Sequence, residues 1–150
     1  MTMVTRSVEV TVDAPLQMAF EYVSDLKRHP EWNKGLQIEE LTPGPIAVGK
    51  QYASRGEVAV QKDRPNTLRV SQYEPPHKFA FTARDPNFGD VQHEFKFTQE
   101  PGGVVISRAM TLRLKPIIAI LFRLLIYPLV GQPSMIRSFA ALKERLEERK

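Results

Sequence analysis

The sequence contains no cysteine, and this absence removes several classes of protein at once. Without thiols there is no disulfide framework, no cysteine nucleophile and no thiolate metal site, which agrees with a reducing compartment. The chain has only three histidines, and they show neither the spacing of a metal site nor a serine and acid arranged around a nucleophile. We therefore expect a cytoplasmic protein that uses no metal and no cofactor.

Two further features are missing, a secretory signal and a basic run. The first residues lack the apolar stretch and the small-residue cleavage site of a signal, and Val4 to Val12 alternate as a strand does. The net charge is only +4, and the basic residues are mixed with acids instead of forming a run with interleaved aromatic residues. We expect no nucleic-acid partner.

There is one long apolar run, from Ile117 to Val130, and its single charge is Arg123. Crossing a bilayer needs about 20 apolar residues, and a run of 10–14 is more often a buried core helix. We therefore expect no stable membrane insertion. Because the run is apolar on nearly every side, we expect a helix that other elements cover on most faces.

The C-terminal residues after this run have the pattern of a surface helix. Their apolar side chains recur at helical spacing, with charged residues between them. These apolar residues are Met135, Phe139, Leu142 and Leu146. Pro128, Gly131 and Pro133 lie at the junction, where proline removes a backbone donor, so we expect a kink or break with Pro133 opening the second helix.

The remaining sequence predicts a single α+β domain over residues 1–150. After the first strand, Asp13 is a good helix N-cap and Pro15 a good early helical residue. A second brief helix or turn then places Trp32 at a corner. From Gly35 onward, runs of strand length alternate with proline and glycine clusters, which predicts an antiparallel sheet. The expected strands are GLQIEELT, VGKQYASRGEVAV, NTLRVSQYE, HKFAFTARD, VQHEFKFT and VVISRAMTLRL.

The opening of the chain, VDAPLQMAFEYVSDLKRHPEW, resembles the signature of the polyketide cyclase/dehydrase and lipid-transport superfamily, also called START-like or Bet v 1-like. The matching features are an Ala-Pro pair, a Phe-x-x-Val-x-Asp run and a Pro-x-Trp. Their residues are Ala14, Pro15, Phe20, Val23, Asp25, Pro30 and Trp32. The closing FAALKERLEE, which contains Leu142 and Lys143, is similar to the end of that family's last helix.

The resemblance implies a helix-grip fold of β-α-α-β6-α order, in which a curved seven-stranded antiparallel sheet wraps a long C-terminal helix around an internal cavity. It also implies a range of functions, because some members are enzymes and many bind lipids, sterols, hormones or polyketides. A covered helix at Ile117 to Val130 fits this fold.

Strand parity places two polar residues on the apolar wall of the expected cavity. In VQHEFKFT, His93 shares a face with Phe95, and in VVISRAMTLRL, Arg108 shares a face with Met110. A four-residue hairpin loop would put His93 opposite Arg108 or close to it, with Phe81 beside His93. An arginine there needs a carboxylate, water or an acidic ligand. Alternatively, a bulge turns Arg108 to solvent, or Asp85, Asp90 or a carbonyl satisfies it.

The expected cavity residues come from the sheet, the corner and the apolar helix. They are Trp32, Tyr52, Ser54, Phe81, His93, Phe95, Arg108, Met110, Leu121, Phe122 and Leu125. Tyr52 and Ser54 share their predicted inward face with Val58, although packing is the commoner role of such aromatic residues. His29 and His77 lie beside prolines, so we expect them at the surface.

Three classes of function fit these residues. The leading hypothesis is a carrier for a small lipid-like or polycyclic molecule, as a monomer or homodimer. The second is a cyclase or dehydratase in which His93 is the general base or acid and Arg108 or Tyr52 holds a developing oxyanion. The third is an interaction protein whose apolar helix is partly exposed and packs on a second copy or a membrane surface. The exposure of Leu121, Phe122 and Leu125 distinguishes the third class from the others.

Overall fold

The computed structural model describes residues 1–56, 66–85 and 89–149. In this part of the chain, seven strands form one antiparallel sheet in the order β1-β7-β6-β5-β4-β3-β2. The strands are β1 (Thr2–Val12), β2 (Gln37–Glu40), β3 (Gln51–Arg55), β4 (Asn66–Glu74), β5 (Lys78–Asp85), β6 (Gly89–Glu100) and β7 (Gly103–Leu114). The helical elements are α1 (Leu16–Ser24), η1 (Leu26–Glu31), α2 (Pro116–Leu121), η2 (Phe122–Gly131) and α3 (Gln132–Arg149).

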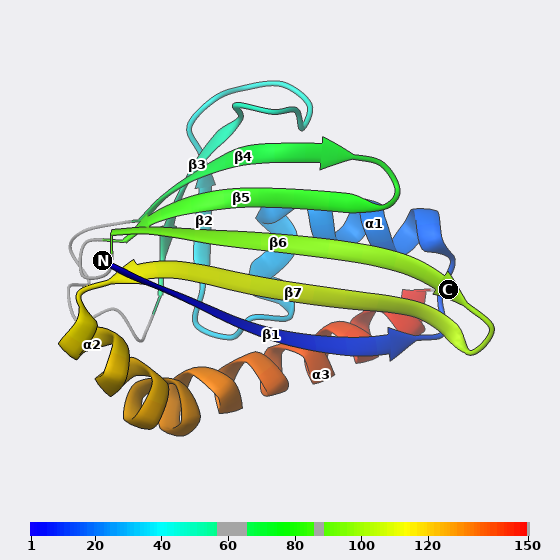
Figure 1. Cartoon of the computed structure of the whole chain (residues 1–150). Helices are drawn as coiled ribbons and strands as arrows, with labels where there is room; N and C mark the ends of the chain where they lie inside the picture. The colour runs from blue at the N-terminus through cyan, green and yellow to red at the C-terminus, as the bar shows by residue number, and fades with distance from the viewer. Residues whose placement is uncertain (57–65, 86–88, 150) are drawn as a thin grey trace.

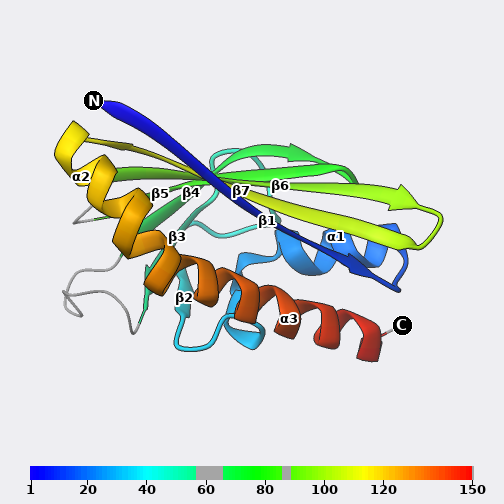
Figure 2. The same cartoon turned by 60° about the horizontal axis from the view of Figure 1, so that its bottom comes forward.

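The helices lie on one face of the curved sheet. Figure 1 shows α1 and η1 under the β4–β6 part of the sheet, and α2, η2 and α3 following one another along the β1–β7 part. The turned view in Figure 2 shows the same long helix crossing beneath the strands, with α1 on the sheet side of it. This is the helix-grip arrangement with the element order that the sequence predicts.

The predicted strands are confirmed, because each stretch contains a strand of the sheet. The alternation of apolar and polar residues matches the two faces of the sheet. In β6, Val91, Phe95 and Phe97 are buried, whereas Gln92 and Lys96 are exposed. Among the described residues of VGKQYASRGEVAV, Gln51–Arg55 is a strand, and the last four residues of that run lie outside the described part of the chain. Val58 lies outside the described residues.

The first helices differ from expectation at one cap. Asp13 does not cap α1, because the helix begins at Leu16 and Pro15 occupies the cap position without a side-chain hydrogen bond. The backbone N–H of Asp13 instead donates to Glu147 Oε2 at 2.9 Å, which ties the end of β1 to α3. The brief second helix is confirmed as η1, whose cap Asp25 accepts from the backbone N–H of Lys27.

The core consists of two apolar clusters on the concave face. The larger one joins α1, η1 and the C-terminal half of α3 to the sheet, and its centre is aromatic. Its largest fully buried members are Phe20, Tyr52, Phe79, Phe95, Phe97, Phe139, Leu26, Ile106, Leu142 and Leu146. The smaller cluster lies under α2 and η2 and consists of Val4, Val91, Leu112, Leu114, Ala119, Phe122, Tyr127 and Met135. Val8 packs against both clusters, so along β1 the boundary between them is near the middle of the strand.

The long C-terminal helix does not break at its prolines. It runs from Pro116 to Arg149 without interruption, and Phe122–Gly131 forms a π-helix around Pro128. Proline has no N–H to donate within the helix, and a wider turn accommodates that gap. Figure 1 shows the helix changing direction between α2 and α3, which agrees with the predicted kink but not with a break. Pro133 is the second residue of α3 instead of the first.

The expectation that Ile117 to Val130 is covered on most faces is wrong. Only Ala119, Phe122 and Tyr127 of this stretch are buried, and Ile117, Leu124 and Leu129 are each about 70% exposed (73%, 69% and 70%). The three buried side chains pack in the smaller cluster, which joins the stretch to β1, β6 and β7. By contrast, the amphipathic part that follows provides Phe139, Leu142 and Leu146 to the main core.

Candidate functional site

The register of β5, β6 and β7 brings His93 and Arg108 together on the concave face. Phe81 pairs with His93, as the sequence predicts. The β6–β7 hairpin pairs Glu100 with Gly103, so its loop is two residues instead of four. This difference shifts the register by two, so that His93 faces Met110 and Arg108 faces Phe95. A shift of two keeps both side chains on the predicted face.

The two side chains are joined by a hydrogen bond. Arg108 Nη2 donates to His93 Nδ1 at 3.0 Å. Arginine is only a donor, so Nδ1 of His93 accepts, and a neutral imidazole then carries its proton on Nε2. The described residues provide no hydrogen-bond partner for His93 Nε2. In this arrangement His93 presents an N–H group to the concave face.

Burial and charge together keep His93 neutral. The protein surrounds its ring, although part of the side chain remains accessible, and this desolvation is the largest cause that lowers the pKa of His93 well below 6.5. The positive charge of Arg108 acts in the same direction. Burial also lowers the pKa of Arg108 to about 10, so the guanidinium stays charged at pH 7.

Arg108 has no carboxylate partner among the described residues. Its guanidinium carbon lies 5.3 Å from the centre of the Phe95 ring, and its Nε is buried without a hydrogen-bond partner. The proposed partner Asp90 instead pairs with Arg84 at 3.0 Å on the outer face. The side chain of Asp85 lies outside the described part of the structure. The alternative that a bulge turns Arg108 to solvent is wrong, because the β6–β7 register is regular.

An aromatic wall surrounds the pair. The ring of His93 stacks on Phe81 at 4.8 Å, and Phe81 in turn lies beside Phe95. Phe139 of α3 stacks on Phe95 from the helix side, at 6.4 Å between ring centres. The charged guanidinium therefore lies against aromatic faces, where cation–π attraction offsets part of its lost hydration.

Trp32 and His29 complete the aromatic wall at the end of η1. The position of His29 differs from the prediction. We expected it at the surface, but only 3% of it is exposed. Its Nε2 lies 2.7 Å from the carbonyl oxygen of Val23, and its ring lies 4.6 Å from that of Trp32. Burial lowers the pKa of His29 to about 3. The signal for this placement is spacing, since residues three apart share a face of a 3₁₀-helix.

The indole of Trp32 provides a third donor in this region. Trp32 is buried and packs edge-on against Phe139 at 6.1 Å. Its Nε1 has no hydrogen-bond partner among the described residues, like Nε of Arg108. Buried indole N–H groups usually find an acceptor. Their side chains contact the two rings of one stack, Trp32 at Phe139 and Arg108 at Phe95.

The structure does not bring Tyr52 to this pair. Tyr52 lies on β3, three strands from His93 on β6, which is roughly 14 Å at the usual strand spacing. Its ring is buried 5.6 Å from the ammonium of Lys50, and burial raises its pKa to about 12. It lines a separate cleft of about 300 Å³ near α1. Ser54, also buried, lies farther along β3.

Of the three helix residues that we expected to line the cavity, one side chain is buried and two are exposed. Phe122 is 5% exposed and packs against Tyr127 in the smaller cluster. Leu121 and Leu125 are 42% and 52% exposed. This exposure is the observation that favours the third class of function. Met110 is partly buried and packs with the smaller cluster beside His93. That all these residues line one cavity stays a prediction.

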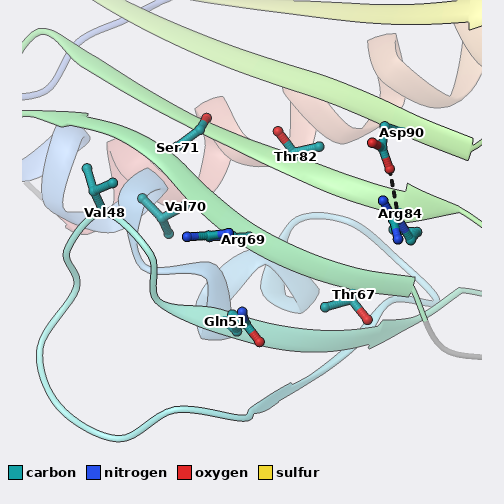
Figure 3. Close-up of a pocket in the computed structure, with 9 residues that line it drawn as sticks. All are labelled: Val48, Gln51, Thr67, Arg69, Val70, Ser71, Thr82, Arg84 and Asp90. Carbon is teal, nitrogen blue, oxygen red and sulfur yellow. Dashed lines mark hydrogen bonds and ion pairs between the residues drawn. The ribbon is translucent and has the colours of Figure 1, made fainter.

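A larger pocket lies on the other side of the sheet. Figure 3 shows it beside β3, β4 and β5, with the side chains of Arg69, Ser71 and Thr82 around it and the Arg84–Asp90 ion pair at one end. Its volume is about 660 Å³. These side chains alternate with the buried residues of the same strands, so the pocket is on the outward face and contains none of the predicted site residues.

The His93–Arg108 arrangement can hold an oxygen but is not set up as a nucleophile or base. The cation and the imidazole N–H are donors, and Nδ1 is occupied by Arg108. Among the described residues, no group of histidine and acid side chains could hold a metal ion. A carbonyl, phenolate or carboxylate oxygen fits a site made of these donors.

Solved structures with the same fold share little sequence with this chain. TTHA0849 from Thermus thermophilus matches with a TM-score of 0.74 at 16% identity, over 97% of this chain and 99% of that one. MLL2253 from Mesorhizobium loti matches with a TM-score of 0.71 at 17% identity, over 97% and 98%. The di-domain ARO/CYC StfQ from the steffimycin biosynthetic pathway matches with a TM-score of 0.75 at 14% identity, over 98% of this chain and 52% of that one.

At these identities the likeness shows the fold alone. No curated protein resembles the chain closely enough to count as a match. A family model, however, matches residues 3–147, which is nearly the whole sequence and overlaps every element of the described fold. The chain therefore belongs to the polyketide cyclase / dehydrase and lipid transport family.

Proposed function

We propose that this chain is a binding or carrier protein for a small, mostly apolar molecule, and that Arg108 and His93 hold one oxygen atom of that molecule. The supporting observation is that Nε of the partly buried Arg108 is itself buried without a hydrogen-bond partner, and that the only side-chain hydrogen bond of this guanidinium among the described residues goes to a neutral imidazole. Leaving a buried donor unsatisfied costs about 1–3 kcal/mol, and more for a charged group. A ligand oxygen at Nε of Arg108 removes this penalty, so the site gains affinity for molecules that carry one.

The donors select the polar end of the ligand. A carboxylate or phenolate oxygen near Arg108 gains a charge-assisted hydrogen bond, and Nε2 of neutral His93 can donate a second one. The N–H of Trp32 is a third donor on the same aromatic stack. Three donors without a base favour binding over chemistry.

The aromatic wall selects the body of the ligand. Phe81, Phe95 and Phe139 present stacked rings next to the pair. Flat apolar molecules gain from burial and from offset stacking on such rings. We therefore propose a polycyclic or lipid-like ligand with its oxygen directed at Arg108.

Binding of different ligands to Arg108 variants tests this proposal. Displacement of Nile red would be measured for 1-naphthoate and for the neutral analogue 1-methylnaphthalene. Replacing Arg108 by Met should weaken the naphthoate by about tenfold or more, the loss of one hydrogen bond to a charged group. The methylnaphthalene affinity should stay the same. Arg113→Met is the matched control, because Arg113 is exposed on the same strand.

The unfolding stability of the Arg108→Met variant separates a ligand-binding role of Arg108 from a merely structural one. Replacing a buried charged group by an apolar side chain of similar size is often neutral or stabilising. Arg108→Met should therefore unfold at the same urea concentration as the wild type or at a higher one. Equal losses for both naphthalene compounds, or no loss for either, would overturn the assignment of Arg108 to ligand binding. Native mass spectrometry of the purified protein would identify a copurifying ligand directly.

The second candidate is a cyclase or dehydratase, and membership of a family described as polyketide cyclase / dehydrase and lipid transport favours it. Catalysis by His93 as a base needs Nδ1 free, so a substrate oxygen would have to draw Arg108 away from it. His93→Gln keeps a hydrogen-bonding side chain but removes the base. In a carrier this variant should bind as the wild type does, whereas an enzyme should lose turnover by roughly a hundredfold or more.

The cell compartment and the oligomeric state belong to the same proposal. We propose a cytoplasmic protein, in keeping with the absence of cysteine. A monomer satisfies the ligand site described above, since every residue in it comes from one chain. Sedimentation of the purified protein would test for a homodimer.

A further inference from the structure

Six of the exposed apolar residues of α2 and η2 form a continuous stripe. They recur at spacings of three and four, so they lie along one side of the helix. The stripe consists of Ile117, Ile120, Leu121, Leu124, Leu125 and Leu129, each at least 42% exposed. Monomers rarely expose contiguous apolar patches of this kind unless the patch binds something. We call these six residues the apolar stripe.

Charge on this part of the chain has a single sign. No acidic residue occurs between Glu100 and Glu144, whereas six basic residues do: Arg108, Arg113, Lys115, Arg123, Arg137 and Lys143. Arg123 and Arg137 are exposed on the helix that carries the stripe, and Lys115 is exposed at its N-cap. The described residues provide no ion-pair partner for any of the three. Arg123 instead donates to the carbonyl oxygen of Met3, another exposed apolar residue, at 3.2 Å.

From these two observations we propose that the apolar stripe docks on the surface of an anionic lipid bilayer. The leucine and isoleucine side chains would enter the interface between headgroups and acyl chains, while Lys115, Arg123 and Arg137 contact lipid phosphates. This is the physics of an interfacial amphipathic helix, whose binding combines buried apolar area with attraction to anionic lipid. The proposal does not depend on the ligand site.

Charge complementarity favours a lipid surface over a second copy of the chain. A twofold dimer would place the same patch of each copy against the other. The segment that carries the stripe has basic residues and no acidic one, so such a dimer would bring like charges together, whereas anionic lipid neutralises them.

The fold favours lying on the membrane over crossing it. The helix from Pro116 to Arg149 is long and apolar enough to span a bilayer by length and composition, so our expectation from length was too strict. Its second half, however, provides Phe139, Leu142 and Leu146 to the main core. Insertion across the bilayer would remove these side chains from the core, whereas surface docking uses only residues that are already exposed.

Cosedimentation with vesicles tests the proposal on the full chain. The vesicles would be pure phosphatidylcholine, or phosphatidylcholine with about one third phosphatidylglycerol, since surface attraction needs anionic lipid. We expect binding to the anionic vesicles that weakens as salt is raised, because screening shortens the range of the attraction. Binding to pure phosphatidylcholine should be weaker by about tenfold or more, given an effect of about 1 kcal/mol for each basic residue near the surface.

Two double variants assign the binding to the stripe. Leu124→Ser with Leu129→Ser should reduce vesicle binding by roughly tenfold or more, because both side chains lose their transfer into the interface. The matched control is Leu41→Ser with Val48→Ser, two exposed apolar residues elsewhere, which should bind as the wild type does. Thermal unfolding of each variant confirms that the fold is kept, as expected for exposed positions.

Four results would overturn the proposal. One is the absence of binding to anionic vesicles, and another is equal binding by the stripe variant and its control. The third is a concentration-dependent dimer that the stripe variant abolishes while vesicles remain unbound, which would make the stripe a contact between copies. Resistance of the bound protein to extraction by high salt and alkaline carbonate would instead indicate insertion, and would also contradict surface docking.

Discussion

The two halves of the C-terminal helix reverse the relation between hydropathy and burial. The half from Ile117 to Val130 is almost wholly apolar, yet most of it is exposed, whereas α3 is amphipathic and provides the helix side of the main core. The reason is the position of each half under the sheet. Phe139 packs against Phe95 of β6 and against Trp32 after η1, whereas η2 packs on the smaller cluster under β1, β6 and β7. Hydropathy measures the tendency of a side chain to leave water. Whether the side chain is buried depends on whether other elements of the fold lie close enough to pack against it.

The largest expected effect is the loss of an aromatic side chain from α3. Phe139→Ala should lower the free energy of unfolding by about 3–5 kcal/mol, the usual cost of truncating a buried phenylalanine. Phe139 is 2% exposed and contacts both Trp32 and Phe95. Urea unfolding would measure the loss. A loss under about 1 kcal/mol would mean that α3 does not anchor the core, and the comparison of the two halves would fail.

The next effect concerns pH and the buried histidine on the α3 side of the core. The folded-state pKa of His29 is about 3, below its ordinary value of 6.5, so the unfolded chain binds a proton first as the pH falls. Stability is therefore full above pH 6.5 and is lost toward pH 3, at about 1.4 kcal/mol per pH unit for this group. Urea unfolding between pH 6.5 and about 4.5 would measure this slope.

Substitution assigns the slope to its residue. His29→Asn should make the stability less dependent on pH by that amount, even though it loses the hydrogen bond to Val23 and some stability at every pH. The control is His77→Asn, at an exposed position in a turn. An unchanged slope in His29→Asn would show that His29 does not titrate as its burial requires.

A smaller effect is expected at the junction between the halves. A methyl group added at Gly131 would lie 2.9 Å from Cδ2 of the buried Tyr127, so the ring must move. Overpacking of this kind costs about 1–3 kcal/mol, and the better helix propensity of alanine offsets up to about 1 kcal/mol. Gly131→Ala should therefore be destabilising by about 1 kcal/mol in thermal unfolding. A stabilised variant would show that the Tyr127 ring has room to move.

The smallest effect is expected on the apolar half itself. Leu129→Ala should change the free energy of unfolding by less than about 0.5 kcal/mol, as exposed substitutions usually do. Leu129 is 70% exposed, although it belongs to the most apolar segment of the chain. The same urea titration used for Phe139→Ala measures it. A loss near that of Phe139→Ala would contradict the exposure of η2 and with it the lipid-docking surface.

Local patterns were sufficient for most of the fold. The alternation in β4 to β7 and the proline and glycine clusters between them predict the strands, because side chains of a strand point alternately to the two faces. The face of His93 and Arg108 follows from the same parity and is confirmed. The exact partner was not predictable, since the hairpin loop length sets the register and a loop of two or of four residues leaves the parity the same.

By itself, the sequence determined the order of elements, the faces of the strands, the apolar character of Ile117 to Val130 and the family to which the chain belongs. Only the tertiary structure decided that His29 is buried, that Tyr52 lies away from Arg108, and that the apolar stretch is largely exposed. The physical reason is that periodicity and hydropathy are properties of neighbouring residues in the chain. Burial depends on which distant segments pack there, and the hydrogen-bond state of Arg108 depends on which acceptors those segments bring within reach.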